Sequence, residues 1–219
     1  MFTKTMFADK YKLYNNDCTK LISYLPKAKL VLTDPPYPNK AGHFIDGIDA
    51  ANEFISNYDC DHWFIFWDEM TEPPCRLPLV AKHIWHRSNT NRPDNYEMIY
   101  EYNIDGKKRA SRVLNYPVIY PGLTGCVEAI GHPTQKNRKL IYELIRMSKE
   151  DGLIIDPFFG SNTTGVVCAK YGIDYIGIEK DKFWFDKGKQ EMENELSQGK
   201  LFQSVGRDVI LSEQPSMFA

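Results

Sequence analysis

The sequence predicts a single α/β domain whose mostly parallel sheet carries helices on both faces. Short apolar segments alternate with helical patterns along the chain. Towards the C-terminus, a strand, a glycine turn, a helix and another strand form a parallel β-α-β unit. The length of 219 residues suits one such domain, and 42% apolar with 26% charged residues is typical of a folded globular chain.

The first half of the chain is predicted to begin with two strands separated by a short helix. Tyr11–Tyr14 forms the first strand, and Cys18–Leu25 is helical up to the next proline. Leu30–Leu32 is the second strand and leads into Thr33-Asp34-Pro35-Pro36-Tyr37-Pro38, whose prolines make a stiff, extended exit. His62–Trp67 is apolar and aromatic, as expected of a strand buried on both faces.

The second half is predicted to continue with strands, loops and two long helices. Leu140, Leu144 and Ser148 share one face of a helix that Gly152 closes. In chain order, the expected elements are strands at 80–85 and 96–102, loops over 106–131, the helix from 140, the β-α-β unit over 153–179 and an amphipathic helix over roughly 181–196.

Composition narrows the function classes. The formal net charge of −2 gives no indication of a nucleic-acid ligand, although a local basic patch is enough to bind a phosphate backbone. No apolar run approaches the roughly 20 residues of a membrane span, and the start lacks a signal-peptide core, which predicts a cytoplasmic protein. Five cysteines without a Cys-x-x-Cys pair indicate neither a disulfide framework nor a zinc ribbon. Cys75, His83 and His86 lack a fourth partner, which favours packing over a metal site.

The β-α-β unit carries two acids in the layout of a nucleoside-binding crevice. Asp156 ends its first strand before a tight glycine turn, and Glu179 ends its second strand, where a carboxylate can accept both ribose hydroxyl protons. The turn lacks Gly-x-Gly-x-x-Gly, and Asp156 would repel a pyrophosphate. A ligand with a ribose and an ammonium group fits better, and S-adenosylmethionine has both.

A second constellation, Asp34-Pro35-Pro36-Tyr37, follows another strand. The Asp34 carboxylate and the Pro35 carbonyl are pure acceptors, suited to an exocyclic amine that donates two hydrogen bonds. Tyr37 offers a face on which a base can stack. Holding both amine protons localises the nitrogen lone pair for attack on an electrophilic methyl group, by positioning and electrostatics alone. Glu72-Pro73-Pro74-Cys75 contains the Pro-Cys dipeptide of enzymes that methylate cytosine at carbon, but it follows an acidic loop and favours a structural Cys75.

Three motifs, in chain order, resemble the amino-group DNA methyltransferases of the β permutation class. They are Asp34-Pro35-Pro36-Tyr37, His132-Pro133-Thr134-Gln135-Lys136 and Asp156-Pro157-Phe158-Phe159-Gly160-Ser161-Asn162-Thr163-Thr164. The resemblance extends to an opening strand at 13–18 and a Trp-containing strand at 84–89. It implies a Rossmann-like S-adenosylmethionine-dependent methyltransferase domain over 1–205, with short target-recognition loops around 103–130 and a flexible tail over 206–219.

The resemblance also implies roles for individual residues. Asp34, Pro35, Pro36 and Tyr37 would hold the flipped target base. The cofactor-binding set would be Asp17, Cys18, Thr134, Gln135, Lys136, Asp156, Phe158, Gly160, Ser161, Asn162, Thr163 and Glu179. Within it, Lys136 would meet the cofactor carboxylate and Glu179 the ribose.

Two positions depart from the pattern of this family. Asn137 stands where the family usually has Pro, and Asn162 replaces a usual Gly. Asn tolerates positive φ better than most residues, so the turn at Asn162 can form.

An Asp at the head of the target motif resembles the adenine branch. The expected function is therefore transfer of a methyl group from S-adenosylmethionine to the N6 amine of adenine in double-stranded DNA, after the base has been rotated out of the stack. Cytosine N4 and a non-catalytic DNA-binding relative stay open as alternatives. Motif order and Asp34 disfavour RNA or a protein amide as the acceptor.

Further partners are indicated outside the motifs. Lys107, Lys108, Arg109 and Arg112 either contact the DNA backbone or form a solvated loop. Gln214–Phe218 resembles the short peptide by which bacterial DNA-acting proteins dock on the sliding clamp, although a frayed terminus explains it equally well. Few residues are left for target-recognition loops, which is consistent with a short target site, relaxed specificity or a homodimer.

Overall fold

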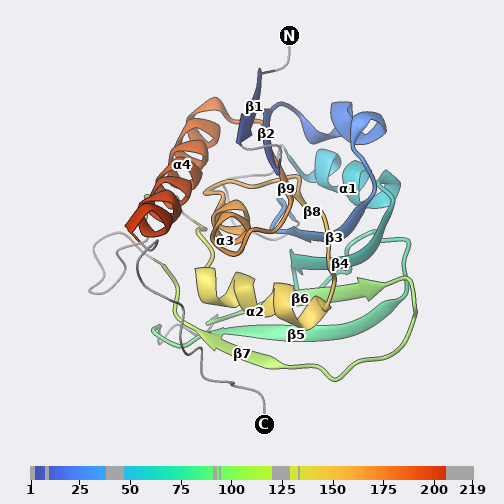
Figure 1. The fold of residues 1–219 in the computed structure, drawn as a ribbon. Helices are drawn as coiled ribbons and strands as arrows, with labels where there is room; N and C mark the ends of the chain where they lie inside the picture. Colours follow the sequence, from blue (N-terminus) through green and yellow to red (C-terminus); the bar gives the residue numbers. More distant parts are fainter. Residues whose placement is uncertain are drawn as a thin grey trace.

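One twisted sheet forms the centre of the protein (Figure 1). The computed structural model describes residues 3–7, 10–37, 47–90, 93, 95–119, 129–132 and 134–205. Within them, the sheet has the strand order β1-β2-β9-β8-β3-β4-β6-β5-β7. The strands are β1 (Thr3–Phe7), β2 (Tyr11–Asn15), β3 (Ala28–Thr33), β4 (Cys60–Trp67), β5 (Leu79–Arg87), β6 (Tyr96–Asn103), β7 (Val113–Tyr116), β8 (Ile154–Asp156) and β9 (Tyr175–Glu179). The helices are the 3-10 helix η1 (Cys18–Tyr24), α1 (Ile48–Asn57), α2 (Arg138–Ser148), α3 (Thr163–Tyr171) and α4 (Lys182–Val205).

The central strands of the sheet run parallel. β2, β9, β8, β3 and β4 pair in parallel from one to the next. β6 runs antiparallel to both β4 and β5, and β7 is parallel to β5. The predicted mostly parallel α/β sheet is therefore confirmed, and the carboxyl ends of its central strands meet at one edge.

Two apolar layers cover the two faces of the sheet. Strand alternation sends Leu30 and Leu32 of β3 into a cluster with α2, α3 and α4, whereas Val31 faces a cluster with η1 and α1. Figure 1 shows these helices on either side of the sheet. The prediction of helices on both faces is confirmed.

Several element boundaries differ from the sequence-based expectation. The predicted strands are all present, and most of them extend by one to a few residues, whereas β9 has the predicted bounds and β8 begins at Ile154. The segment from Cys18 is a 3-10 helix, and α4 continues to Val205. Lys149, with φ of 57°, ends α2, so the expectation that Gly152 closes this helix was wrong.

Three elements were not predicted: β1, α1 and β7. β7 lies inside the region expected to be loops, and its short sequence alternates between exposed and buried positions without an apolar run. Residues 120–128 of the predicted recognition loops and the predicted tail, 206–219, lie outside the described residues. Within the described part of the chain, no helix is long and apolar enough to cross a membrane.

Candidate active site

A cavity of about 690 Å³ lies at the carboxyl ends of β2, β3, β8 and β9. Its size is that of a small-molecule site. It collects most of the predicted site residues, although they come from distant parts of the sequence. Those that line it are Asp17, Cys18, Asp34, Pro35, Pro36, Thr134, Lys136, Asp156, Phe158, Gly160, Ser161, Thr163 and Glu179. Tyr37, Gln135 and Asn162 are not among its lining residues.

Asp156 provides a buried carboxylate at the end of β8. It is only 4% exposed, and its Oδ1 accepts hydrogen bonds from the Thr33 hydroxyl (3.1 Å) and the Phe158 N–H (3.2 Å). Burial raises the pKa of Asp156 to about 7, with a smaller contribution from the nearby Asp34, although the hydrogen bonds oppose this rise. A cationic group entering the cavity would therefore find an acid that binds it best in the deprotonated form.

Glu179 ends β9 and is held by the glycine turn that follows β8. Its Oε2 accepts a hydrogen bond from the Gly160 N–H (2.9 Å), and its Oε1 accepts one from the Asp181 N–H (2.7 Å). Burial raises the pKa of Glu179. Gly160 has φ of 50°, and a Cβ there would lie 2.8 Å from Nε2 of His132, so this position needs glycine. The carboxylate is thus fixed in orientation while both oxygens keep lone pairs for further donors.

Contacts between other residues of the cavity wall bring the sequence motifs together. Asp17 caps η1 by accepting from the Thr19 N–H (3.1 Å), and the buried Cys18 follows it. The Thr163 hydroxyl lies 3.0 Å from that of Ser161 and 3.4 Å from the backbone carbonyl of Lys136. The second and third motifs therefore meet at the cavity wall.

Asn162 has a packing role rather than a place in the cavity wall. Its φ of 59° confirms that Asn can hold the turn in the left-handed region. Its buried side chain donates to the Gly188 carbonyl (3.0 Å) and accepts from the Tyr175 hydroxyl (2.9 Å). A Cβ on Gly165 would lie 2.2 Å from its Oδ1, and one on Gly188 would lie 2.7 Å from its Cβ. The Asn that replaces the usual Gly is thus accommodated by two other glycines.

Asn137, the second departure, caps α2. Its Oδ1 accepts hydrogen bonds from the N–H groups of Lys139 (2.9 Å) and Leu140 (3.4 Å). Its amide donates to the Pro117 carbonyl (3.0 Å). A side-chain cap satisfies free N–H groups at a helix start, so Asn serves this position without the Pro.

Lys136 lies beside the target-amine motif. Its Nζ donates to Oδ2 of Asp34 at 2.5 Å and is 3.4 Å from Oε2 of Glu97. The ammonium also sits over the rings of Phe66 (4.7 Å) and Trp85 (5.6 Å), and the residue is 6% exposed. The resemblance assigned Lys136 to the cofactor carboxylate, whereas the structure pairs it with two acids of the protein. Its path over the aromatic rings explains this placement.

Tyr37 and Gln135 support the site from behind the cavity wall. The Tyr37 hydroxyl donates to Oε1 of Glu97 at 2.6 Å, and its ring packs against Trp67 with centroids 5.7 Å apart. Burial, followed by the charge of Glu97, raises the pKa of Tyr37, so the phenol stays neutral. Oε1 of Gln135 accepts from the Ile130 N–H (3.0 Å). These contacts hold Tyr37 beside the cavity, next to the motif residues that line it.

Sequence reasoning assigned no role to three residues of the site, His132, Trp184 and Glu97. His132 and Trp184 both line the cavity and meet edge to face at 4.4 Å. Trp184 is the third residue of α4, and an aromatic residue five positions after the acid that ends β9 is the signal that could have indicated it. Glu97 gives no signal beyond a charged residue in a predicted strand.

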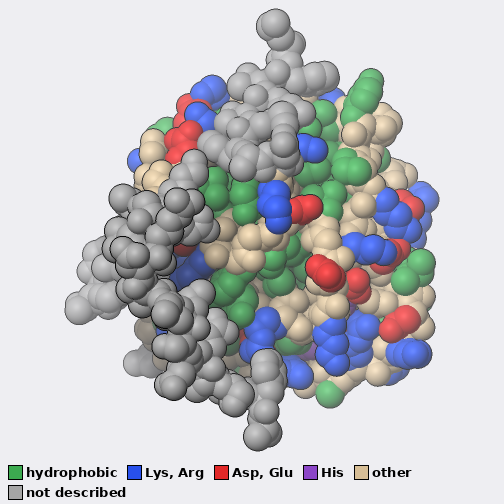
Figure 2. Space-filling model, viewed as in Figure 1, with side chains coloured by type: hydrophobic (Ala, Val, Ile, Leu, Met, Phe, Trp, Pro, Cys, Tyr) green, Lys and Arg blue, Asp and Glu red, His purple; other side chains and the backbone are tan. Residues whose placement is uncertain are grey.

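The four basic residues predicted to contact DNA do not line the cavity. They follow β6, whose last residue pairs with His62 near the start of β4, at the opposite edge of the sheet. Arg109 donates to Glu101 (2.6 Å) and Asp105 (3.1 Å), and Lys108 donates to the Leu79 carbonyl (2.7 Å). In Figure 2, basic side chains are interspersed with acidic ones on the face shown. DNA contact through Lys107, Lys108, Arg109 and Arg112 stays a prediction that their position does not favour.

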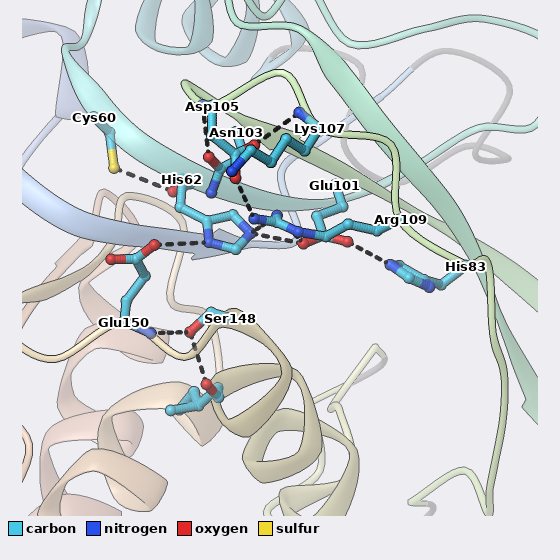
Figure 3. A network of polar contacts seen from close by, with 11 residues as sticks. Cys60, His62, His83, Glu101, Asn103, Asp105, Lys107, Arg109, Ser148 and Glu150 are labelled. Atoms are coloured by element: carbon cyan, nitrogen blue, oxygen red, sulfur yellow. Dashed lines mark hydrogen bonds and ion pairs between the residues drawn. The ribbon is translucent and has the colours of Figure 1, made fainter.

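Arg109 belongs instead to a buried polar network at that edge (Figure 3). Glu101 lies at its centre and bonds with Nε2 of His62 (2.9 Å) and Nε2 of His83 (3.0 Å). Burial alone would raise the pKa of Glu101, but His62, His83 and Arg109 together hold it down to about 2. His83 is thus used structurally. Among the residues that the structure describes, no cluster of His, Cys, Asp and Glu suits a metal ion.

The chain is similar to known DNA methyltransferases. A DNA methylase family model matches residues 59–190. The type II methyltransferase M2.LlaDCHI of Lactococcus lactis subsp. cremoris is 35% identical over 123 residues, which cover 53% of this chain and 43% of that protein. M2.DpnII of Streptococcus pneumoniae is 36% identical over 119 residues, covering 51% and 41%. The matched part thus spans less than half the length of these relatives.

Solved structures share the fold. The M1.HpyAVI–SAM complex aligns with 82% of this chain and 98% of its own, at 20% identity and a TM-score of 0.57. PvuII DNA methyltransferase, described as cytosine-N4-specific, aligns over 88% and 92%, at 16% identity and a TM-score of 0.60. The Rossmann-like methyltransferase fold expected from the sequence is therefore confirmed.

Proposed function

Because this chain belongs to the DNA methylase family of N6 and N4 methyltransferases, we propose that it transfers a methyl group from S-adenosylmethionine to the N6 amine of adenine in double-stranded DNA. One observation carries this proposal: Asp34 and Asp156 line the same cavity from the ends of β3 and β8, which are neighbours in the sheet. In this proposal, Asp34 binds the amine that accepts the methyl group, and Asp156 binds the cationic methyl donor. A DNA substrate is consistent with the cytoplasmic location expected from the sequence.

The cavity suits S-adenosylmethionine on the chemistry of its lining. Asp156 is a buried acid that a cation stabilises in its charged form, and Glu179 is an oriented acceptor for a diol. His132 and Trp184 add an aromatic wall. When bound, S-adenosylmethionine supplies an electrophilic methyl group on a sulfonium centre. Asp156, Gly160 and Glu179 are the residues that would hold it.

The target amine would meet the other half of the cavity. Asp34 and the Pro35 carbonyl would accept hydrogen bonds from its two N–H groups and thereby localise the nitrogen lone pair. Lys136 donates to Oδ2 of Asp34, which holds this carboxylate at the cavity. A base in a duplex reaches such a pocket only after it has been rotated out of the stack.

The choice between adenine and cytosine needs direct product analysis. Asp34 at the head of the motif supports adenine, whereas the cytosine-N4-specific PvuII enzyme has a similar fold. The protein is incubated with S-adenosylmethionine and unmethylated duplex DNA, and the digested nucleosides are separated by mass spectrometry. We expect N6-methyladenine, and RNA of the same sequence as a poor acceptor.

The variant Asp34→Asn serves as the control for chemistry. It keeps the size of the side chain and should reduce transfer by at least about 1,000-fold while the affinity for S-adenosylmethionine changes less than about threefold. N4-methylcytosine as the sole product would refute the adenine assignment. Absence of any methylated base would refute the proposed function.

A further inference from the structure

Glu97 is a buried acid beside the active site that none of the three motifs contains. It is 5% exposed and lies in β6 opposite Trp85 of β5, at the edge of the sheet where the cavity lies. Burying a carboxylate is unfavourable unless charged or hydrogen-bonding partners compensate it. The identity of its partners therefore indicates why a charge stands at this position.

Two partners of Glu97 belong to the motifs that build the site. Its Oε1 accepts a hydrogen bond from the Tyr37 hydroxyl at 2.6 Å, and its Oε2 is 3.4 Å from Nζ of Lys136. Arg87 also reaches Oε2, at 3.1 Å. One carboxylate thus joins the tyrosine of the first motif to the lysine of the second, although 99 residues separate them in the sequence.

Lys136 is shared between Glu97 and Asp34. Its ammonium donates to Asp34 at 2.5 Å, and both side chains are largely shielded from water, at 8% and 15% exposure. A lysine that paired with Asp34 alone would neutralise the carboxylate that must accept a hydrogen bond from the target amine. Because Glu97 also attracts the Lys136 ammonium, less of the lysine charge is compensated by Asp34. Asp34 is then a stronger hydrogen-bond acceptor than it would be if it paired with Lys136 alone.

We propose that Glu97 is a positioning residue of the target-base site, which orients Tyr37 through its hydroxyl and shares the charge of Lys136 with Asp34. This inference rests on the proposed function. Glu97 is not among the residues that line the cavity, so it acts through Tyr37 and Lys136 rather than on the substrate. Its removal should therefore lower kcat more than it weakens binding of either substrate.

The kinetic test uses Glu97→Gln, which removes the charge and keeps the size. We expect kcat to fall by about 100-fold, while KM for DNA and the Kd for S-adenosylmethionine change by less than about threefold. Glu101→Gln is the matched control, because Glu101 is a buried, Arg-paired acid of the same strand at the opposite edge of the sheet. At a temperature where circular dichroism shows both variants folded, Glu101→Gln should keep kcat within about twofold of wild type.

A double-mutant cycle tests whether Glu97 affects kcat through Tyr37. Tyr37→Phe removes only the hydroxyl that Glu97 holds, and it should lower kcat about fivefold in wild type but less than about twofold in Glu97→Gln. Additive losses would show that Glu97 does not act through Tyr37. A wild-type kcat in Glu97→Gln would overturn the inference and leave the proposed function intact.

The contact between Glu97 and Lys136 can be tested without enzymatic turnover. Because Lys136 is buried between two acids, NMR of ¹⁵N-lysine-labelled protein should show a slowly exchanging ammonium signal that Lys136→Met removes. In Glu97→Gln, exchange at this signal should accelerate by at least about tenfold, because one of the two negative charges that hold the ammonium is lost. An unchanged signal would refute the sharing of Lys136. If the wild-type protein methylates no DNA, the proposed function is refuted, but the Lys136 signal still tests whether Glu97 contacts this lysine.

Discussion

Replacing Asp156 with Asn should stabilise the unliganded protein while removing its affinity for S-adenosylmethionine. Burial raises the pKa of this carboxyl from 3.8 to about 7. Between these two values the folded protein holds a proton that the unfolded chain releases, so ionisation in the unfolded chain favours unfolding increasingly as the pH rises. The resulting loss in the free energy of unfolding grows by about 1.4 kcal/mol per pH unit between the two pKa values. Above pH 7 it is constant at about 4 kcal/mol.

Asn avoids this cost because it stays neutral at every pH. Its Oδ1 can still accept hydrogen bonds from the Thr33 hydroxyl and the Phe158 N–H, although bonds to a neutral amide are weaker than those to a carboxylate. We therefore expect Asp156→Asn to raise the free energy of unfolding by about 2–4 kcal/mol at pH 8 and by almost nothing at pH 4.

Urea unfolding followed by tryptophan fluorescence measures the difference at pH 4, 6 and 8, and calorimetric titration measures the binding of S-adenosylmethionine. Asp151→Asn is the control, because Asp151 is exposed and its replacement should change stability by less than about 0.5 kcal/mol. A variant less stable than wild type at pH 8, or a difference independent of pH, would contradict the reasoning.

Four further predictions follow from the structure. The Kd for S-adenosylmethionine should rise about tenfold per pH unit below pH 7, because Asp156 must then lose a proton on binding; a flat profile in calorimetry between pH 5.5 and 8 would exclude this role. Glu101→Gln should lower the free energy of unfolding by about 3 kcal/mol at pH 7, and the loss should shrink as the pH falls from 4.5 towards 2, where wild-type Glu101 also takes up a proton; a loss below 1 kcal/mol in urea would count against the network. Asn162→Gly should cost about 1–3 kcal/mol in the same assay while the cofactor Kd stays within about threefold, since the side chain packs outside the cavity; a larger change in Kd would return Asn162 to the cofactor site. Deletion of residues 212–219 should abolish capture by an immobilised sliding clamp, and a pull-down that loses nothing would end the clamp hypothesis.

The parts of the fold that could be predicted have local signals. Apolar runs and turn residues identify β3, β4, β8 and β9 without knowledge of their neighbours. Acids at the ends of β8 and β9 could be assigned to one cavity because the carboxyl ends of parallel strands meet. β7 could not be predicted, since it becomes a strand only by pairing with β5.

The misplaced residues depend on contacts between distant segments. Lys136 is a charged residue before a helix in the sequence, but its partner is decided by the rings of Phe66 and Trp85, which direct it to Asp34. The basic residues after β6 look alike in the sequence, and only the antiparallel direction of β6 places them at the edge away from the cavity.

The pairing of β2 with β9 shows that the site depends on which strands are neighbours in the sheet, and this has a consequence for the evolution of the chain. Tyr11–Asn15 aligns with Tyr175–Glu179, so segments from opposite ends of the sequence are neighbours in the sheet. The positions of Asp34 and Asp156 follow from strand adjacency, and the order in which the strands are synthesised does not enter. A gene rearrangement that preserved these strand pairings would keep both carboxylates in place. The order of the two motifs is then a record of ancestry, and the catalytic geometry is independent of it.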